Sequence, residues 1–213
     1  MTPVVLSGDL VASRAYGADK AARVLSEVVN QVNARFSEAL LVPLDVIQGD
    51  AFQGVAVAGP DALALVFRLQ GGLVGRTGGR LRSRFGLGLG AIDQELANVE
   101  DPSLLTGPAF VAAAKALARA RKERRQLVLQ SGRPDLDAAA DGTFGLVEFV
   151  WKRWSAEVWR RALRYDEVAD IGTLAEELGV SYQAVHKQLH GRGVLAVRAG
   201  LAGVGALLKE VGG

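Results

Sequence analysis

The sequence predicts an α+β fold in which a ferredoxin-like domain is followed by an all-α domain with a helix-turn-helix. Three observations favour it. Apolar, β-prone runs alternate with helical periodicity before residue 130, only helical periodicity follows residue 143, and residues 173–190 have the pattern of two short helices around a glycine. We therefore expect a sheet domain over 1–130, a linker over 131–142 and a helical domain over 143–213.

The first half of the chain has the order strand, helix, hairpin, helix, strand. Residues 3–7 favour a buried strand that ends before Gly8-Asp9, and apolar residues recur at helical spacing over 18–37 and 61–75. Residues 44–59 place β-prone runs on both sides of Gly49-Asp50, which predicts a hairpin. With a strand over 85–92, this is the βαββαβ order, for which we expect an antiparallel sheet with helices on one face.

Further elements follow from the same patterns. Residues 106–120 predict a helix with Thr106 as a possible cap, and 126–131 predict a further edge strand. Residues 131–142 combine Gly, Pro, Asp and small residues without periodicity, which is typical of a linker. Residues 144–165 predict one long helix that carries all three tryptophans, and we expect these to pack rather than to stack on bases.

Composition excludes some classes of site. The chain has 213 residues, 49% of them hydrophobic, a net charge of +2 and no cysteine, so disulfides and thiolate metal sites are excluded. No apolar run is long enough to span a bilayer, and the first residues lack a basic segment, so we expect a cytoplasmic protein. His186 and His190 could share a helix face and hold a metal, but no third ligand is obvious.

The stretch 173–190 predicts a helix-turn-helix. Gly179 occupies the turn, Val180 is expected to plug it, Ser181 can cap the second helix, and Val185 and Leu189 can anchor that helix at i, i+4. The outward side chains would then face a major groove. We expect DNA contacts from Ser181, Tyr182, Gln183, His186, Lys187 and Arg192. The alternative is an ordinary pair of helices used for packing or dimerisation.

Two Gly-Asp turns, Gly8-Asp9 and Gly49-Asp50, form a second candidate site. Asp9 follows the first strand and Asp50 lies in the hairpin turn, so the two carboxylates could meet at one edge of the sheet and bind Mg²⁺ or Mn²⁺ with a nucleotide. The residues expected to bind phosphate are Ser13, Arg14, Gly49 and Gln53. The alternative is that both aspartates only close turns, in which Gly-Asp is common.

The segments SGDLVASR, QGDAFQG, RFGLGLGAI and TGPAF, in this order, resemble the SatD family over nearly the whole chain. The resemblance implies a palm-like or cyclase-like N-terminal domain joined to a DNA-binding type of C-terminal domain. The hairpin also resembles those of class III and diguanylate cyclases, which implies that Asp9 and Asp50 form a metal-binding pair. Ala51 departs from that pattern, because such relatives usually carry glutamate there.

These observations together favour a cytoplasmic DNA-binding protein, a transcriptional regulator, that acts as a homodimer on double-stranded DNA. Its palm-like domain would sense a nucleotide or another anionic ligand. A metal-dependent nucleotide enzyme, a cyclase or nucleotidyltransferase relative with the helix-turn-helix as a docking module, is the first alternative. A non-catalytic scaffold or interaction protein is the second.

Overall fold

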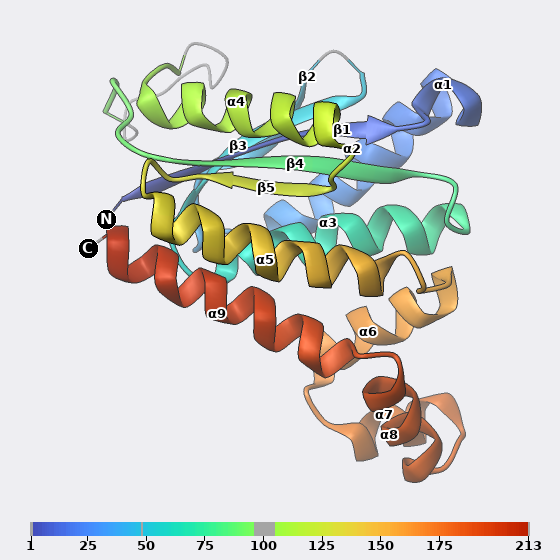
Figure 1. Ribbon diagram of the computed structural model, residues 1–213. Helices are drawn as coiled ribbons and strands as arrows, with labels where there is room; N and C mark the ends of the chain where they lie inside the picture. Colours follow the sequence, from blue (N-terminus) through green and yellow to red (C-terminus); the bar gives the residue numbers. More distant parts are fainter. Residues whose placement is uncertain (1, 48, 96–104, 213) are drawn as a thin grey trace.

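A computed structural model describes residues 2–47, 49–95 and 105–212 and confirms an α+β fold built on a five-stranded sheet (Figure 1). The strand order is β2-β3-β1-β4-β5. Strand β1 is antiparallel to β3 and β4, β2 is antiparallel to β3, and β5 is parallel to β4, so the sheet is mixed. The strands are β1 (Pro3–Val11), β2 (Leu40–Ile47), β3 (Ala51–Val57), β4 (Arg82–Leu89) and β5 (Leu127–Gln130).

Helices cover both faces of this sheet (Figure 1). The helices are α1 (Ser13–Tyr16), α2 (Ala18–Arg35), α3 (Pro60–Thr77), α4 (Pro108–Glu123), α5 (Pro134–Trp151), α6 (Ala156–Val168), α7 (Ile171–Leu178), α8 (Tyr182–Gly191) and α9 (Val194–Gly212). The expectation that helices lie on one face is wrong, because β1 is apolar on both sides. Its Val4 and Leu6 join the main core, whereas Val5 packs with Ala109 and Ala113 of α4 on the opposite face.

Two glycines of β4 allow α4 to lie close to the sheet. A Cβ atom on Gly88 would lie 2.2 Å from the Ala109 carbonyl oxygen, and one on Gly86 would lie 2.4 Å from the Ala113 carbonyl oxygen. The expected cap of α4 is wrong. Gly107 is the N-cap and supplies no side chain, while the Thr106 hydroxyl donates to Asp93 at 3.1 Å.

The expected linker is helical from Pro134 onward, so that prediction is wrong. Residues 134–142 form the first half of α5, in which Leu136 and Ala140 are buried. Pro134 at the helix start and Asp135 in the first turn suit a helix N-terminus, but their composition resembles that of a loop. The expected long helix over 144–165 is likewise divided in two, because Ser155 caps α6 by accepting the Val158 N–H at 3.3 Å.

The C-terminal helices pack on the helices of the sheet and share its main core. Phe67 of α3 contacts all three tryptophans of the chain, with ring centroids 6.4 Å from Trp151, 6.3 Å from Trp154 and 5.3 Å from Trp159. Helix α9 lies against α3 and α5, where a Cβ on Gly205 would lie 2.4 Å from Pro60 Cα. Residues 143–212 therefore have no separate core of their own.

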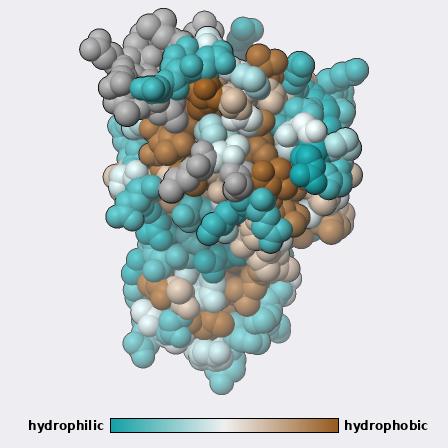
Figure 2. Space-filling model, turned by 90° about the vertical axis from the view of Figure 1, so that its left-hand side faces the viewer, coloured by the Kyte–Doolittle hydropathy of each residue, from teal (hydrophilic) through white to brown (hydrophobic). Residues whose placement is uncertain are grey.

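Helices α7 and α8 form a small lobe at the bottom of Figure 1, which Figure 2 shows below the larger sheet-containing lobe. The chain turns between them at Gly179, whose φ is 63°. Val185 and Leu189 are buried at 1% exposure each, but Val180 is 41% exposed, so the expectation that Val180 plugs the turn is wrong. None of the helices described is both long and apolar enough to cross a membrane.

Candidate functional site

The exposed face of α8 carries most of the residues expected to contact DNA. The Ser181 hydroxyl caps the helix by accepting the Ala184 N–H at 3.2 Å, which satisfies one free backbone donor of the first turn. The rings of Tyr182 and His186 stack with centroids 5.9 Å apart, and those of His186 and His190 lie 4.1 Å apart. These three rings occupy successive turns of one helix face, and all three residues are exposed.

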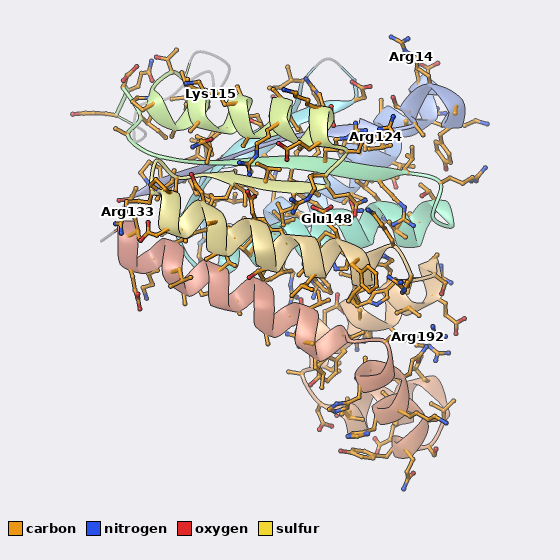
Figure 3. All side chains as sticks on the ribbon, viewed as in Figure 1. Arg14, Lys115, Arg124, Arg133, Glu148 and Arg192 are labelled. Atoms are coloured by element: carbon orange, nitrogen blue, oxygen red, sulfur yellow. The ribbon has the colours of Figure 1, made fainter. Side chains whose placement is uncertain are left out.

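The cations of this lobe have few acidic partners. Gln183, Lys187 and Arg192 are exposed, and within the described part of the chain no carboxylate pairs with Lys187 or Arg192. Figure 3 shows Arg192 at the upper end of this lobe, where α8 gives way to α9. Glu177 of α7 is neutralised instead by Arg164, whose guanidinium donates to it at 2.7 Å and lowers its pKa. The α8 face therefore presents mainly neutral donors and cations.

The structure places Asp9 and Asp50 differently from the sequence prediction. Asp9 does not follow β1 but lies inside it, directly opposite Ala51 of β3 and Arg84 of β4. Asp50 immediately precedes β3, and its carbonyl oxygen accepts the Leu10 N–H at 2.8 Å. The two aspartates lie at the same end of neighbouring strands, but their side chains bond to different groups, Asp9 to Arg121 and Asp50 to Ser13.

Asp9 is held by two arginines. Its Oδ2 accepts a hydrogen bond from Arg121 Nε at 2.6 Å, and its Oδ1 lies 3.8 Å from an Arg84 terminal nitrogen. Oδ1 is buried and has no hydrogen-bond partner among the described residues. A buried polar atom without a hydrogen-bond partner is costly, and Arg82 Nη1 is a second such atom among the described residues.

Of the four residues expected to bind phosphate, Ser13 has a side chain that donates a hydrogen bond to an aspartate of the pair. The buried Ser13 hydroxyl donates to Asp50 Oδ2 at 2.9 Å. Gly49 lies in the hairpin turn with a φ of 78°, and Gln53 donates to the Ser7 hydroxyl at 2.7 Å within the sheet. Arg14 is exposed on α1 and points away from the sheet in Figure 3.

Arg84 and Arg121 were missed by the sequence analysis. Arg82 and Arg84 are two residues apart on β4, so both side chains lie on the face of the sheet that carries Asp9. Burial lowers the pKa of Arg82. Arg121 belongs to the basic stretch 115–125, but nothing in that stretch distinguishes it from its neighbours. Only the position of α4 over the sheet brings it to Asp9.

Asp9 and Asp50 differ in how their carboxylates are held. Asp9 Oδ1 has no hydrogen-bond partner among the described residues, and Asp50 uses Oδ2 for the bond to Ser13. Carboxylate oxygens suit Mg²⁺, which usually keeps few protein ligands and takes the rest from phosphate and water. Among the described residues, no group of three or more His, Asp or Glu side chains is placed to hold a metal. The histidine pair of α8 therefore has no third ligand among them.

Comparison with known proteins identifies one family. The sequence model of the SatD family matches residues 4–199. No curated protein matches the chain. Two solved structures, each described as a bacterial light-regulated adenylyl cyclase, are similar at 13% identity, with TM-scores of 0.47 and 0.46. The similarity covers 60% of this chain and 74% of the first, and 61% of this chain and 43% of the second.

Proposed function

The chain belongs to the SatD family, and we propose that it is a DNA-binding protein, a transcriptional regulator. The proposal treats α7 and α8 as a helix-turn-helix over 173–190 with α8 in the major groove. The observation that supports it is the division of α8 into two faces. Val185 and Leu189 are buried, whereas Gln183, His186 and Lys187 are exposed on the other side of the same helix.

Each exposed residue has a role in this proposal. Gln183 and His186 would contact base edges, because an amide and an imidazole can donate and accept in the pattern that the major groove presents. Lys187 and Arg192 would contact phosphates, which position the helix without reading sequence. Ser181 and Tyr182 at the start of α8 would lie nearest the backbone, where a helix N-terminus favours an anion.

The regulator would act as an assembly of two copies. One ten-residue helix offers little contact area, so a cytoplasmic homodimer that binds two half-sites would supply the missing affinity. The strand order β2-β3-β1-β4 with its intervening helices is consistent with a ferredoxin-like, palm-like domain. In the proposed regulator this domain senses a nucleotide or another anion.

The test measures DNA affinity on sequences selected from a random duplex library. We expect salt-dependent binding that Gln183→Ala with Lys187→Ala weakens by about tenfold or more. The matched control, Gln31→Ala with Lys122→Ala, removes the same residue types from exposed positions of α2 and α4 and should bind as the wild type does. Equal binding by the α8 double variant would refute the proposal.

A metal-dependent nucleotide-binding enzyme, with α7 and α8 as a docking module, is the second candidate. The observation that favours it is the buried Asp9 Oδ1, which has no hydrogen-bond partner among the described residues and belongs to the strand next to β3, which Asp50 precedes. Asp9 and Asp50 would hold Mg²⁺ or Mn²⁺, and a bound ion would neutralise phosphate oxygens. The chain itself would contribute Arg121 and Arg84, which fix the Asp9 carboxylate, and Ser13, which fixes Asp50.

A further inference from the structure

Helix α5 has an uncharged outer face. Between Asp135 and Lys152 its exposed residues are all apolar or glycine: Ala138, Ala139, Gly142, Leu146 and Phe149. Leu146 is 71% exposed and Phe149 is 57% exposed, more than any other large apolar residue in the described part of the chain. A helix face that meets only water normally carries polar side chains, so this face indicates a partner.

The α5 stripe consists of Asp135, Ala139, Gly142, Leu146 and Phe149. At 3.6 residues per turn, these five positions lie within about 40° of one line along the helix. Helix α9 borders the stripe on one side, where a Cβ on Gly200 would lie 3.3 Å from Thr143 Cγ2. Figure 1 shows the two helices side by side, on the side of the sheet away from α4, so the stripe is an outer surface of the molecule.

The side chains of the α5 stripe change in size along the helix. Ala139 and Gly142 in its first half are small, and a Cβ on Gly142 would meet no atom within 4 Å. Leu146 and Phe149 in its second half are large and exposed. A surface with small residues at one end and large residues at the other is complementary in shape to an antiparallel copy of itself.

The two ends of the α5 stripe also differ in charge. Asp135 and Asp137 lie in the first turn of α5, where Arg133 pairs with Asp135 at 3.0 Å. Arg153 follows the other end, and no carboxylate among the described residues pairs with it. Its guanidinium lies 3.5 Å from the centroid of the Phe149 ring, which places this positive charge at the end of the stripe. An antiparallel copy would bring the acidic end of each stripe to the basic end of the other.

We propose that a second copy of the chain covers the α5 stripe, with the two α5 helices packed antiparallel about a two-fold axis. The axis passes midway between Gly142 and Leu146. Leu146 of each copy then lies against Gly142 of the other, and Phe149 of each copy lies against Ala139 of the other. Each large side chain meets a small one, which allows the two helices to approach closely.

The same axis places Arg153 of each copy against Asp135 of the other. Each copy contributes both charges, so the interface is a single self-complementary patch, as two-fold symmetry requires. The inference rests on the proposed function in one respect only, the homodimer, for which it names the surface that joins the two copies.

Helix α9 extends this interface. A stable dimer buries about 1,200–2,000 Å² in total, more than one stripe about 27 Å long supplies. Gly200 of α9 contacts α5, and the residues one turn before it and one and two turns after it are exposed and uncharged: Ala196, Gly203 and Leu207. The apolar surface of α5 therefore continues onto α9.

The first experiment measures the mass of the full chain in solution, without DNA, by sedimentation equilibrium. We expect a dimer that Leu146→Glu and Gly142→Leu each weaken by about tenfold or more, because one places a charge in the interface and the other fills the space for Leu146. Both changes suit the folded monomer, since Leu146 is 71% exposed and the position of Gly142 is open; circular dichroism verifies the fold. The matched control is Val111→Glu, at a 53% exposed position of α4, which should leave the dimer unchanged.

A second experiment tests the antiparallel register. The chain has no cysteine, so introduced cysteines react without background. Ala139→Cys and Phe149→Cys should form a disulfide with each other when the two variants are mixed and oxidised, because each position lies opposite the other in the dimer. Either variant alone should form far less, since its two cysteines lie at opposite ends of the interface.

Three results would overturn the proposal: a chain that stays monomeric at high concentration, a dimer that Leu146→Glu and Gly142→Leu both leave intact, and disulfide yields that mixing does not raise. A monomer whose DNA binding still depends on Gln183 and Lys187 would refute this interface and leave DNA binding standing. A dimer that Gly142→Leu disrupts but that binds no DNA would support the interface and refute the proposed function.

Discussion

Asp166 and Arg198 lie on either side of the α7–α8 lobe in the sequence and meet at 2.7 Å in the structure. Their ion pair joins α6, which precedes the lobe in the chain, to α9, which follows it. Arg68 of α3 donates to the same carboxylate, which ties this closure to the helix layer under the sheet. One carboxylate is therefore shared by α3, α6 and α9 where the lobe joins the rest of the molecule.

Replacing Asp166 by alanine should strongly destabilise the fold. The Arg68 side chain is 9% exposed, and without Asp166 most of its charge would be buried beside Glu167 alone. Breaking a buried pair from one side typically costs about 3–5 kcal/mol. Urea unfolding measures the change.

The control for this prediction is Glu27→Ala, which breaks the pair of Glu27 with Arg76. Both of those side chains are well exposed, at 61% and 38%, so we expect a cost of about 0–1 kcal/mol. Equal effects of Asp166→Ala and Glu27→Ala would show that the Asp166 network does not hold the helices together.

The start of α7 should depend on pH. The Thr173 backbone N–H donates to Asp170 at 2.7 Å, and its hydroxyl donates at 2.9 Å; these bonds lower the pKa of Asp170. A carboxyl group with a lowered folded-state pKa stabilises the fold above its unfolded pKa, and this contribution is lost as the pH falls through the lower folded value. We therefore expect α7 to loosen in acid.

Amide hydrogen exchange of Thr173 measures this effect across the acidic range. Asp170→Asn keeps a capping side chain but removes the charge, so protection in that variant should no longer fall as Asp170 titrates. Protection of Thr173 that falls equally in the wild type and in Asp170→Asn would exclude Asp170 as the cause.

The salt dependence of DNA binding should separate phosphate contacts from base contacts. Lys187→Ala and Arg192→Ala should each reduce the slope of log affinity against log salt by about 0.9, the value of one released counterion. Gln183→Ala should leave the slope unchanged and weaken binding only to the preferred DNA sequence. A slope that no substitution on α8 alters would place the phosphate contacts on another surface.

Metal-dependent nucleotide binding, if the second candidate is correct, should require both aspartates. A Mg²⁺–nucleoside triphosphate at about 100 times its Kd would stabilise the fold by about 2.7 kcal/mol, and Asp9→Asn or Asp50→Asn should abolish that thermal shift. Asp45→Asn is the control, because Asp45 is an exposed neighbour on β2. Tighter nucleotide binding without metal in Asp9→Asn would instead show that Asp9 competes with phosphate for Arg121, and would contradict a metal site.

Local signals predicted most of the secondary structure. The periodicities of β1 to β4, α2 and α3 placed each element within a few residues, because burial on one or both faces produces them directly. The start of α5 was missed, because its Gly, Pro and Asp residues also occur in loops and the burial of Leu136 depends on tertiary packing. The position of α4 on the second face of the sheet was missed for the same reason.

In the candidate sites too, local features were predicted from the sequence and long-range contacts were not. Gly179 and Ser181 were identified from their neighbours alone, since a left-handed turn and a helix cap are properties of a few consecutive residues. The partners of Asp9 were not, because Arg121 lies 112 residues away and reaches Asp9 only once α4 has packed on β4. Val180 was misplaced, because the short turn leaves its side chain exposed.

The packing of α9 against α3 also affects the order in which the protein can be completed during synthesis. Helix α3 is buried on nearly every side, and α9, whose residues are translated more than 110 positions later, covers part of it. Until the ribosome has released residues 194–212, Leu63 and Phe67 lack their cover and remain available to other apolar surfaces. A nascent chain stalled before Val194 should therefore be a substrate for chaperones, even though every strand of the sheet has already been made.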